Sequence, residues 1–229
     1  MPDLDFVVEG AEVALHSVSP LLLFKLRVTN RGSSGPPTAQ EEIASLALHC
    51  QIQIEATRRT YEPVDQARLS ELFGVPKRWS QTLRTLLWTH ASAAVPPFTD
   101  TCRVDLPVPC TFDFNVAAAK YFDALGDGEI PLMLQFSGTI FYRESDGTLQ
   151  VARVPWHKEA AFRLPVATWR AMRDYYYPNT AWMSVQRGVF ERLERYRIEQ
   201  GLTGWDEALT ALLDERRSEP AWPDHGGLQ

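Results

Sequence analysis

Hydrophobic and polar residues alternate regularly along several stretches of the chain. The alternation is clearest over Leu21–Asn30 and over Ala44–Thr57. Because successive side chains of a strand point to opposite faces of a sheet, each stretch predicts a strand with one buried and one solvated face. Similar patterns predict six further strands: Asp5–Leu15, Trp79–Ala94, Thr99–Val108, Pro131–Tyr142, Thr148–Val154 and Glu159–Leu164. The first of these is interrupted near Gly10.

One longer helix is predicted within this series, over residues 113–125. Its apolar residues recur at helical spacing, with Thr111 or Asp113 available as a cap and Gly126 as the left-handed residue that ends it. A short helix over Asp65–Phe73, capped by Asp65, is also predicted. A helix lying across the strand at 131–142 would form the core of an α+β domain.

The hydrophobic period changes after Pro165, where residues 166–176, 180–200 and 205–216 each carry an apolar stripe at helical spacing. The sequence therefore predicts an α+β protein with an antiparallel sheet and one packed helix, followed by a C-terminal helical appendage. The predicted boundaries are an antiparallel sheet domain at 1–164 containing helix 113–125, a helical appendage at 165–217 and a flexible tail at 218–229.

Composition narrows the classes of partner. The chain of 229 residues is 45% hydrophobic and has a formal net charge of −6, which argues against a nucleic-acid partner. No apolar run approaches the roughly 20 residues that span a bilayer, and the N-terminus lacks the pattern of a signal peptide. With an odd count of 3 cysteines, these features predict a cytoplasmic protein. They do not predict its oligomeric state.

Few residues suggest catalysis. Cys110 comes just before the predicted helix, where a thiolate is favoured, but it also continues the buried alternation of a strand and has no histidine nearby. Asp113, Asp123, Asp127 and Glu129 are close in sequence, as acid–base pairs can be, although caps and turns use the same residues. Histidine and cysteine spacings do not match metal sites, and no glycine-rich nucleotide motif is present. We therefore expect no catalytic residue, no metal and no cofactor.

Aromatic residues are concentrated where the predicted appendage begins. Five large rings fall within one helix–turn–helix segment, more than a short helix pair is expected to bury. Tyrosine and tryptophan are favoured anchors in protein interfaces, so those that stay exposed are candidates for partner binding, while the alternative is that all of them belong to the core. The candidates are Trp169, Tyr175, Tyr176, Tyr177 and Trp182.

Two resemblances extend this picture. The segments VPCTFDFNVAAAKYF, DGEIPLMLQFSGTIFY and YYPNTAW, within Phe6–Leu213, resemble an uncharacterised bacterial domain-of-unknown-function family found beside genes for uptake nickel–iron hydrogenases. That resemblance implies a genomic context and no activity.

More distantly, Cys110–Tyr142 is similar in pattern to the export chaperone SecB, which implies an antiparallel sheet backed by one helix. The appendage after Pro165 departs from SecB, as does the missing cysteine-rich tail. No functional residues are carried over from either family. The SecB-like pattern consists of Cys110, Phe114, Gly128, Pro131, Leu132, Leu134 and Phe141.

Three hypotheses of function follow. The first is a non-enzymatic accessory or chaperone-like protein that binds an immature or unfolded polypeptide through apolar surface, with a hydrogenase subunit or maturation factor as client if the genomic association holds. The second is a structural or scaffold subunit that binds one folded partner, through the turn at Tyr175–Trp182. The third is an enzyme that uses Cys110 or the acidic cluster near Asp113.

Overall fold

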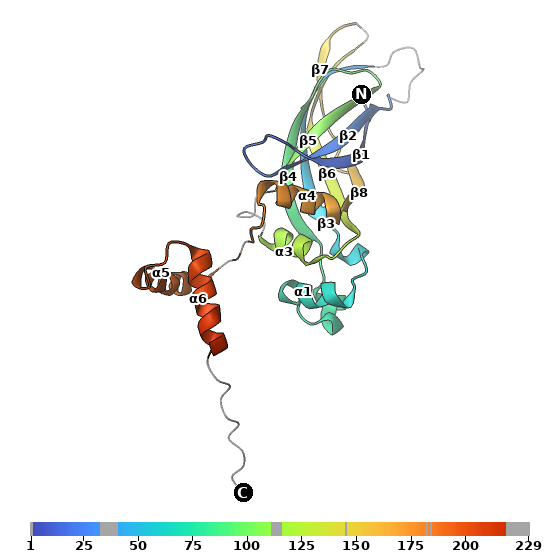
Figure 1. The fold of residues 1–229 in the computed structure, drawn as a ribbon. Coiled ribbons are helices and arrows are strands. Elements are labelled where there is room, and N and C mark those ends of the chain that lie inside the picture. Colours follow the sequence, from blue (N-terminus) through green and yellow to red (C-terminus); the bar gives the residue numbers. More distant parts are fainter. Residues whose placement is uncertain are drawn as a thin grey trace. The chain divides into compact units, whose positions relative to one another are not determined.

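The computed structural model describes residues 2–32, 41–110, 116–144, 146–181, 183 and 185–218. Antiparallel sheets and helices α1–α6 confirm the α+β class (Figure 1). The chain divides into two compact units, residues 1–180 and 181–229. The SecB-like motif and the expected helix start at 113 fall partly on residues 111–115, and the expected tail on 219–229; both segments lie outside the described residues.

The first unit contains two antiparallel sheets. The smaller has the order β1-β2-β5 and consists of β1 (Leu4–Val13), β2 (Leu21–Asn30) and β5 (Thr101–Pro109). The larger has the order β4-β3-β6-β7, with β8 also pairing with β6, and consists of β4 (Leu86–Val95), β3 (Glu42–Ile54), β6 (Glu129–Arg143), β7 (Leu149–Arg153) and β8 (Glu159–Pro165). The interruption expected near Gly10 is a register shift between Val8 and Gly10 of β1.

The apolar faces of these two sheets pack against each other. Phe6 of β1 stacks on Phe136 of β6 with ring centroids 4.4 Å apart, and Phe24 of β2 lies 5.2 Å from Phe162 of β8. Buried residues of both sheets belong to one hydrophobic core. The structure therefore differs from the single SecB-like sheet that was expected, because a second sheet covers the apolar face that would otherwise have been available to a client.

Helices close one end of this sandwich. The helical segments are η1 (Ala56–Arg58), α1 (Pro63–Phe73), η2 (Pro76–Arg78), α2 (Trp79–Thr82), α3 (Val116–Ala124) and α4 (Val166–Tyr176), and α1 and α3 lie together at one end of the strands (Figure 1). Phe122 of α3 lies 4.8 Å from the ring of Trp88 and 4.5 Å from that of Trp169. This aromatic cluster joins α3 and α4 to β4.

Three local predictions were wrong. The strand expected over Trp79–Ala94 begins at Leu86, because Trp79 starts a helical turn and its indole Nε1 donates to the Gly74 carbonyl at 2.9 Å. Asp65 does not cap α1 but lies buried inside its first turn. The positive φ of 86° after α3 belongs to Gly128 and not to Gly126, whose N–H donates to Asp65 at 2.9 Å.

Helix α4 belongs to the first unit, so the unit boundary falls after residue 180 and not at 165. Its apolar stripe is buried at Val166, Trp169 and Met172, and the helix contacts β1, β8 and α3. The sequence could not distinguish this docked helix from the following ones, because all three carry an apolar stripe.

The second unit contains α5 (Arg187–Glu199) and α6 (Trp205–Ser218), joined by a short connection. The first of these helices begins at Arg187, so the expected start at 180 is too early by several residues. Thr203 lies just before α6, and both its N–H and its hydroxyl donate to the Glu207 carboxylate at 2.9 Å, which fixes the start of the helix.

Candidate functional site

The aromatic candidates do not form one exposed cluster among the residues that the structure describes. Trp169 is buried, and its indole donates to Asp123 at 3.0 Å. Tyr176 is half-buried and its hydroxyl donates to the Ala14 carbonyl, which ties α4 to the end of β1. Tyr177 is also half-buried, while Tyr175 has 47% of its surface exposed. Trp182 lies outside the described residues.

Cys110 is placed as a structural residue. Its side chain is buried, and its thiol donates to the Val108 carbonyl at 3.3 Å. Burial raises the pKa of the Cys110 thiol to about 12. The thiolate suggested by its place before a helix is therefore disfavoured at neutral pH, because no nearby charge compensates for burial among the described groups that act on it.

The acidic residues around α3 serve separate local contacts. Asp123 accepts hydrogen bonds from Trp169 and Arg173, both at 3.0 Å. Asp127 accepts from the N–H of Gly128 at 2.7 Å, and Glu129 forms a long ion pair of 3.9 Å with Arg163. Asp113 lies outside the described residues. The three described carboxylates are thus engaged by different partners and do not form an acid–base pair.

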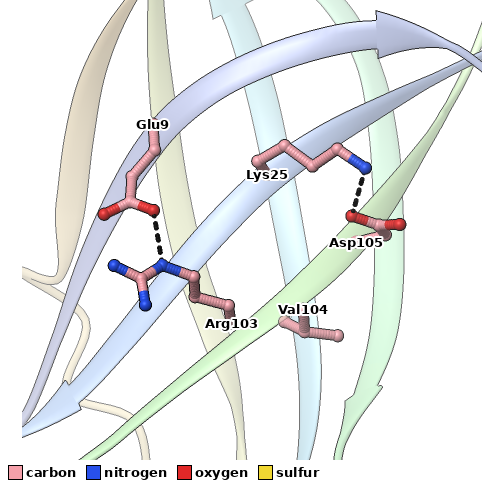
Figure 2. A pocket seen from close by; sticks show the side chains of 5 residues that line it. All are labelled: Glu9, Lys25, Arg103, Val104 and Asp105. Atoms are coloured by element: carbon pink, nitrogen blue, oxygen red, sulfur yellow. Dashed lines mark hydrogen bonds and ion pairs between the residues drawn. The ribbon is translucent and has the colours of Figure 1, made fainter.

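A shallow hollow of about 440 Å³ lies on the solvated face of the smaller sheet. Figure 2 shows that its charged side chains pair with one another across strands, Glu9 with Arg103 and Lys25 with Asp105. Hydrogen bonds from Arg103 and Arg27 lower the pKa of Glu9, and hydrogen bonds to Glu12 and Asp105 raise that of Lys25. Since these charges satisfy each other, the hollow has the character of a solvated sheet face.

Among the described residues, no group of three or more histidine, cysteine, aspartate or glutamate side chains is arranged to hold a metal ion. Nor does any described helix combine the length and the apolar character that crossing a membrane requires.

The hairpin of α5 and α6 is the main concentration of exposed apolar surface. Within its described side chains, Ala208 is the only hydrophobic residue that is fully buried. The two helices contact through rings, with Phe190 lying 5.1 Å from Trp205 and the guanidinium of Arg197 lying 4.9 Å from the same indole. We call the following set the exposed hairpin residues: Val189, Phe190, Trp205, Leu212 and Leu213.

The same two helices also carry charged residues that pair with one another or with a hydroxyl. Arg187 pairs with Glu191 at 2.9 Å along α5, and the Tyr196 hydroxyl donates to Glu215 of α6 at 3.1 Å. An apolar stripe with a charged rim is the composition of a protein interface and not of a catalytic pocket. The sequence already indicated both stripes, but it did not show that they would lack a cover, because that depends on which helices dock onto the sandwich.

Comparisons with known proteins give a family and two distant likenesses. A family model with the description "Family of unknown function (DUF6084)" matches residues 1–221. No curated protein matches the chain. One similar solved structure, of a protein described as late embryogenesis abundant (LEA), has 14% identity and a TM-score of 0.27, with 72% of this chain and 73% of that chain covered.

Another similar solved structure is of a protein described as ApaA, from Bordetella pertussis. It has 13% identity and a TM-score of 0.22, with 71% of this chain and 93% of that chain covered. At these TM-scores, neither likeness supports a conclusion about fold or function.

Proposed function

Because the chain belongs to a family of unknown function, DUF6084, we propose a function from its own structure. The protein is a non-enzymatic accessory protein that binds one folded partner protein through the hairpin of α5 and α6. The observation that carries this proposal is the set of exposed hairpin residues, in a unit where Ala208 alone of the described hydrophobic side chains is fully buried.

The size of the hairpin supports the need for a partner. Helices of this length are marginal in water unless an apolar face packs against something. Val189 and Leu213 keep 47% and 66% of their surface exposed, although each lies on the apolar side of its helix. Complete burial of a side chain of this kind, compared with full exposure, contributes about 1.5–3 kcal/mol to the stability of a complex. A partner would therefore stabilise the hairpin as well as bind it.

The shape of the surface favours a folded partner over an unfolded client. A helix presents a convex stripe, which fits a groove that is already formed in the partner. A protein that holds unfolded chains instead needs a broad apolar surface of its own. The obvious candidate for that surface, the apolar face of the larger sheet, is occupied by the smaller sheet. This favours the scaffold hypothesis over the chaperone-like one.

The residues that suggested catalysis support the non-enzymatic part of the proposal. Cys110 has a raised pKa and a buried side chain, and the carboxylates near α3 hold tryptophan, arginine and backbone groups. The identity of the partner is a further part of the proposal. The resemblance to proteins encoded beside uptake hydrogenase genes makes a hydrogenase subunit or maturation factor the first candidate to test.

The test compares the wild-type protein with a double variant, Val189→Glu with Leu213→Glu. Leu87→Glu is the matched control, because Leu87 lies on β4 of the other unit and its exposed fraction of 54% falls between those of Val189 and Leu213. Each protein is titrated by calorimetry with purified, folded hydrogenase subunits and maturation factors, chosen by affinity purification from the host. We expect one of them to bind the wild type and the control alike and to bind the double variant at least about tenfold more weakly.

Equal binding by the double variant, or a failure of every folded candidate to bind, would refute the proposal. If stoichiometric amounts of the wild-type protein and of the double variant suppressed the aggregation of an unfolded client equally well, the result would instead support the chaperone-like hypothesis.

A further inference from the structure

A second surface with the character of a binding site lies on the first unit, at the free edge of the larger sheet. Strand β7 pairs with β6, and no described strand pairs with its other side. The register places Val151 opposite Phe141 and Leu149 opposite Arg143, so these side chains share one face. We call this surface the β7 edge patch, and it consists of Phe141, Arg143, Leu149, Val151 and Arg153.

The β7 edge patch faces away from the core. Ala152 and Ile140, the residues between its members, are buried on the opposite side. Val151 has 61% of its surface exposed and Leu149 has 52%, although both are β-strand residues of a folded sheet. Proteins normally protect an edge strand that has apolar side chains on its open face, because its free backbone groups can pair with another strand.

The charges at the ends of the patch are positive. Neither Arg143 nor Arg153 forms an ion pair with any residue that the structure describes, and Arg143 donates a hydrogen bond to the Gly147 carbonyl at 3.4 Å. Glu42 lies opposite Arg143 in the register but is not within ion-pair distance of it. On the smaller sheet, by contrast, Arg103 is paired with a carboxylate. The patch thus carries two cations without carboxylate partners in a chain whose net charge is −6.

We propose that the β7 edge patch binds an extended segment of a partner protein that adds a strand to β7 and carries acidic residues on both sides of an apolar centre. The free backbone of β7 requires an extended occupant, since only a strand can satisfy its row of N–H and C=O groups. Leu149 and Val151 require apolar side chains on the same face, and the two arginines require carboxylates beside them. This inference goes beyond the proposed function and concerns a different unit.

A second copy of this chain fits the edge less well. If two β7 strands paired about Val151, Arg153 of each copy would meet Leu149 of the other, and four arginines would gather on one small face. Four like charges held close together on one face repel one another. The charge of the patch therefore favours a foreign acidic segment over self-association.

Trp156 extends the site beyond β7. Val154 donates to the Gly138 carbonyl and Phe136 donates to the Lys158 carbonyl, so β7 and β8 lie along the same edge of β6 and the chain leaves that edge between them. Trp156 lies in this excursion with 91% of its surface exposed. Tryptophan that is exposed in this way is a common anchor of protein interfaces, and here it follows the last residue of β7 by three positions.

The probe is a fluorescently labelled peptide of about seven residues, the length of a short strand, that alternates valine with threonine and has aspartate at both ends. Two further peptides serve as comparisons: one has lysine at both ends, and the other has proline at its centre, which removes a backbone donor. Binding to the full chain is measured by fluorescence anisotropy at low and at high salt. We expect the acidic peptide to bind about tenfold or more tightly than either comparison, and its advantage over the lysine peptide to shrink at high salt.

The variants make this preference specific to the patch. Arg153→Glu is expected to abolish the preference between the aspartate and lysine peptides, because the remaining positive charge of Arg143 is then offset by one negative charge, and Trp156→Ala is expected to weaken the binding of both peptides. Arg84→Glu, an equivalent charge change at another exposed arginine, is expected to leave the preference unchanged. Arg153→Gln repeats the test without adding a negative charge, and far-UV circular dichroism checks that each variant is folded.

Three results would overturn the inference. One is equal binding of the aspartate and lysine peptides, or no binding of either up to about millimolar concentration. Another is a preference that Arg153→Glu leaves intact. The third is concentration-dependent self-association of the wild type, measured by sedimentation and abolished by Val151→Lys. Such a result would mean that the edge of β7 pairs with a second copy of the chain. The hairpin variant Val189→Glu with Leu213→Glu is expected to bind the peptide normally, so this inference and the proposed function can fail independently.

Discussion

Replacing Gly138 with alanine should strongly destabilise the sandwich. Gly138 lies in the middle of β6, opposite Leu48 of β3, with a φ of 153°. A Cβ atom at this position would lie 2.2 Å from the carbonyl oxygen of Ala47 and 3.2 Å from the Cα of Leu48. Both neighbours are backbone atoms of the central strand pair, so no flexible side chain can move aside.

The size of the effect follows from these contacts. A backbone conformation that L residues rarely adopt costs about 1–2 kcal/mol. Forcing an extra carbon into a packed interior costs a further 1–3 kcal/mol or so. We therefore expect a loss of about 3 kcal/mol or more in the free energy of unfolding, a large share of the roughly 5–15 kcal/mol of a typical domain. Relief of the contact would require β3 and β6 to separate locally.

The assay is urea unfolding of the full chain, followed by near-ultraviolet circular dichroism, which reports the packed rings of Trp88, Phe122 and Trp169 in the first unit. With a urea dependence of about 2 kcal/mol per molar, the midpoint should fall by about 1.5 M. Gly10→Ala is the matched control, because nothing lies within 4 Å of a Cβ at this other strand glycine. If Gly138→Ala lost less than about 1 kcal/mol, or no more than the control, the reasoning would be wrong.

Three further predictions concern other parts of the molecule. Burial raises the pKa of Cys50 and Cys110 to about 12, so above about pH 9 the unfolded chain loses thiol protons that the folded chain keeps. Below about pH 8 these thiols should therefore leave the free energy of unfolding unchanged. Between about pH 9 and 12 each thiol should lower it by about 1.4 kcal/mol per pH unit. Denaturant titrations at several pH values should show a shallower fall for a variant in which both cysteines are replaced by alanine. Asp123→Ala should lower the free energy of unfolding by about 1–3 kcal/mol, measured by thermal or urea unfolding, because the buried indole of Trp169 loses its hydrogen-bond acceptor. Asp123→Asn should lower it less. Gly188→Ala should raise the helix content or the melting temperature of the second unit, because a Cβ at Gly188 meets nothing within 4 Å and alanine is the better helix former. The gain should be smaller than the roughly 1 kcal/mol of a helix interior, since Gly188 is the second residue of α5, and a decrease would contradict this reasoning.

The sequence predicted individual strands well because alternation is a property of each strand alone. Residues 21–30 form a strand with the predicted bounds, and every second residue, such as Leu22 and Phe24, is buried. Alternation identifies the apolar face but not what covers it. The pairing of β2 with β5, and not with β3, depends on contacts between residues far apart in the chain. For that reason one sheet was expected where two are present.

The candidate sites were less predictable for the same reason. Trp169 and Trp205 both lie on apolar helical stripes, yet Trp169 is buried and Trp205 is half exposed. Only the docking of α4 onto β1 and β8 distinguishes them. The β7 edge patch could not be inferred at all, because it depends on the register that sets Phe141 opposite Val151 and on Arg153 having no carboxylate partner among the described residues.

The two proposed surfaces use different physical interactions, and salt can separate them. The exposed hairpin residues are apolar, so their binding should depend weakly on ionic strength and should strengthen with added kosmotropic salt. The β7 edge patch relies on Arg143 and Arg153, whose attraction to carboxylates at the surface is screened when the Debye length falls to about 3 Å at 1 M salt. A partner retained at high salt and lost with Leu213→Glu therefore occupies the hairpin. A partner released by salt and lost with Arg153→Glu occupies the edge.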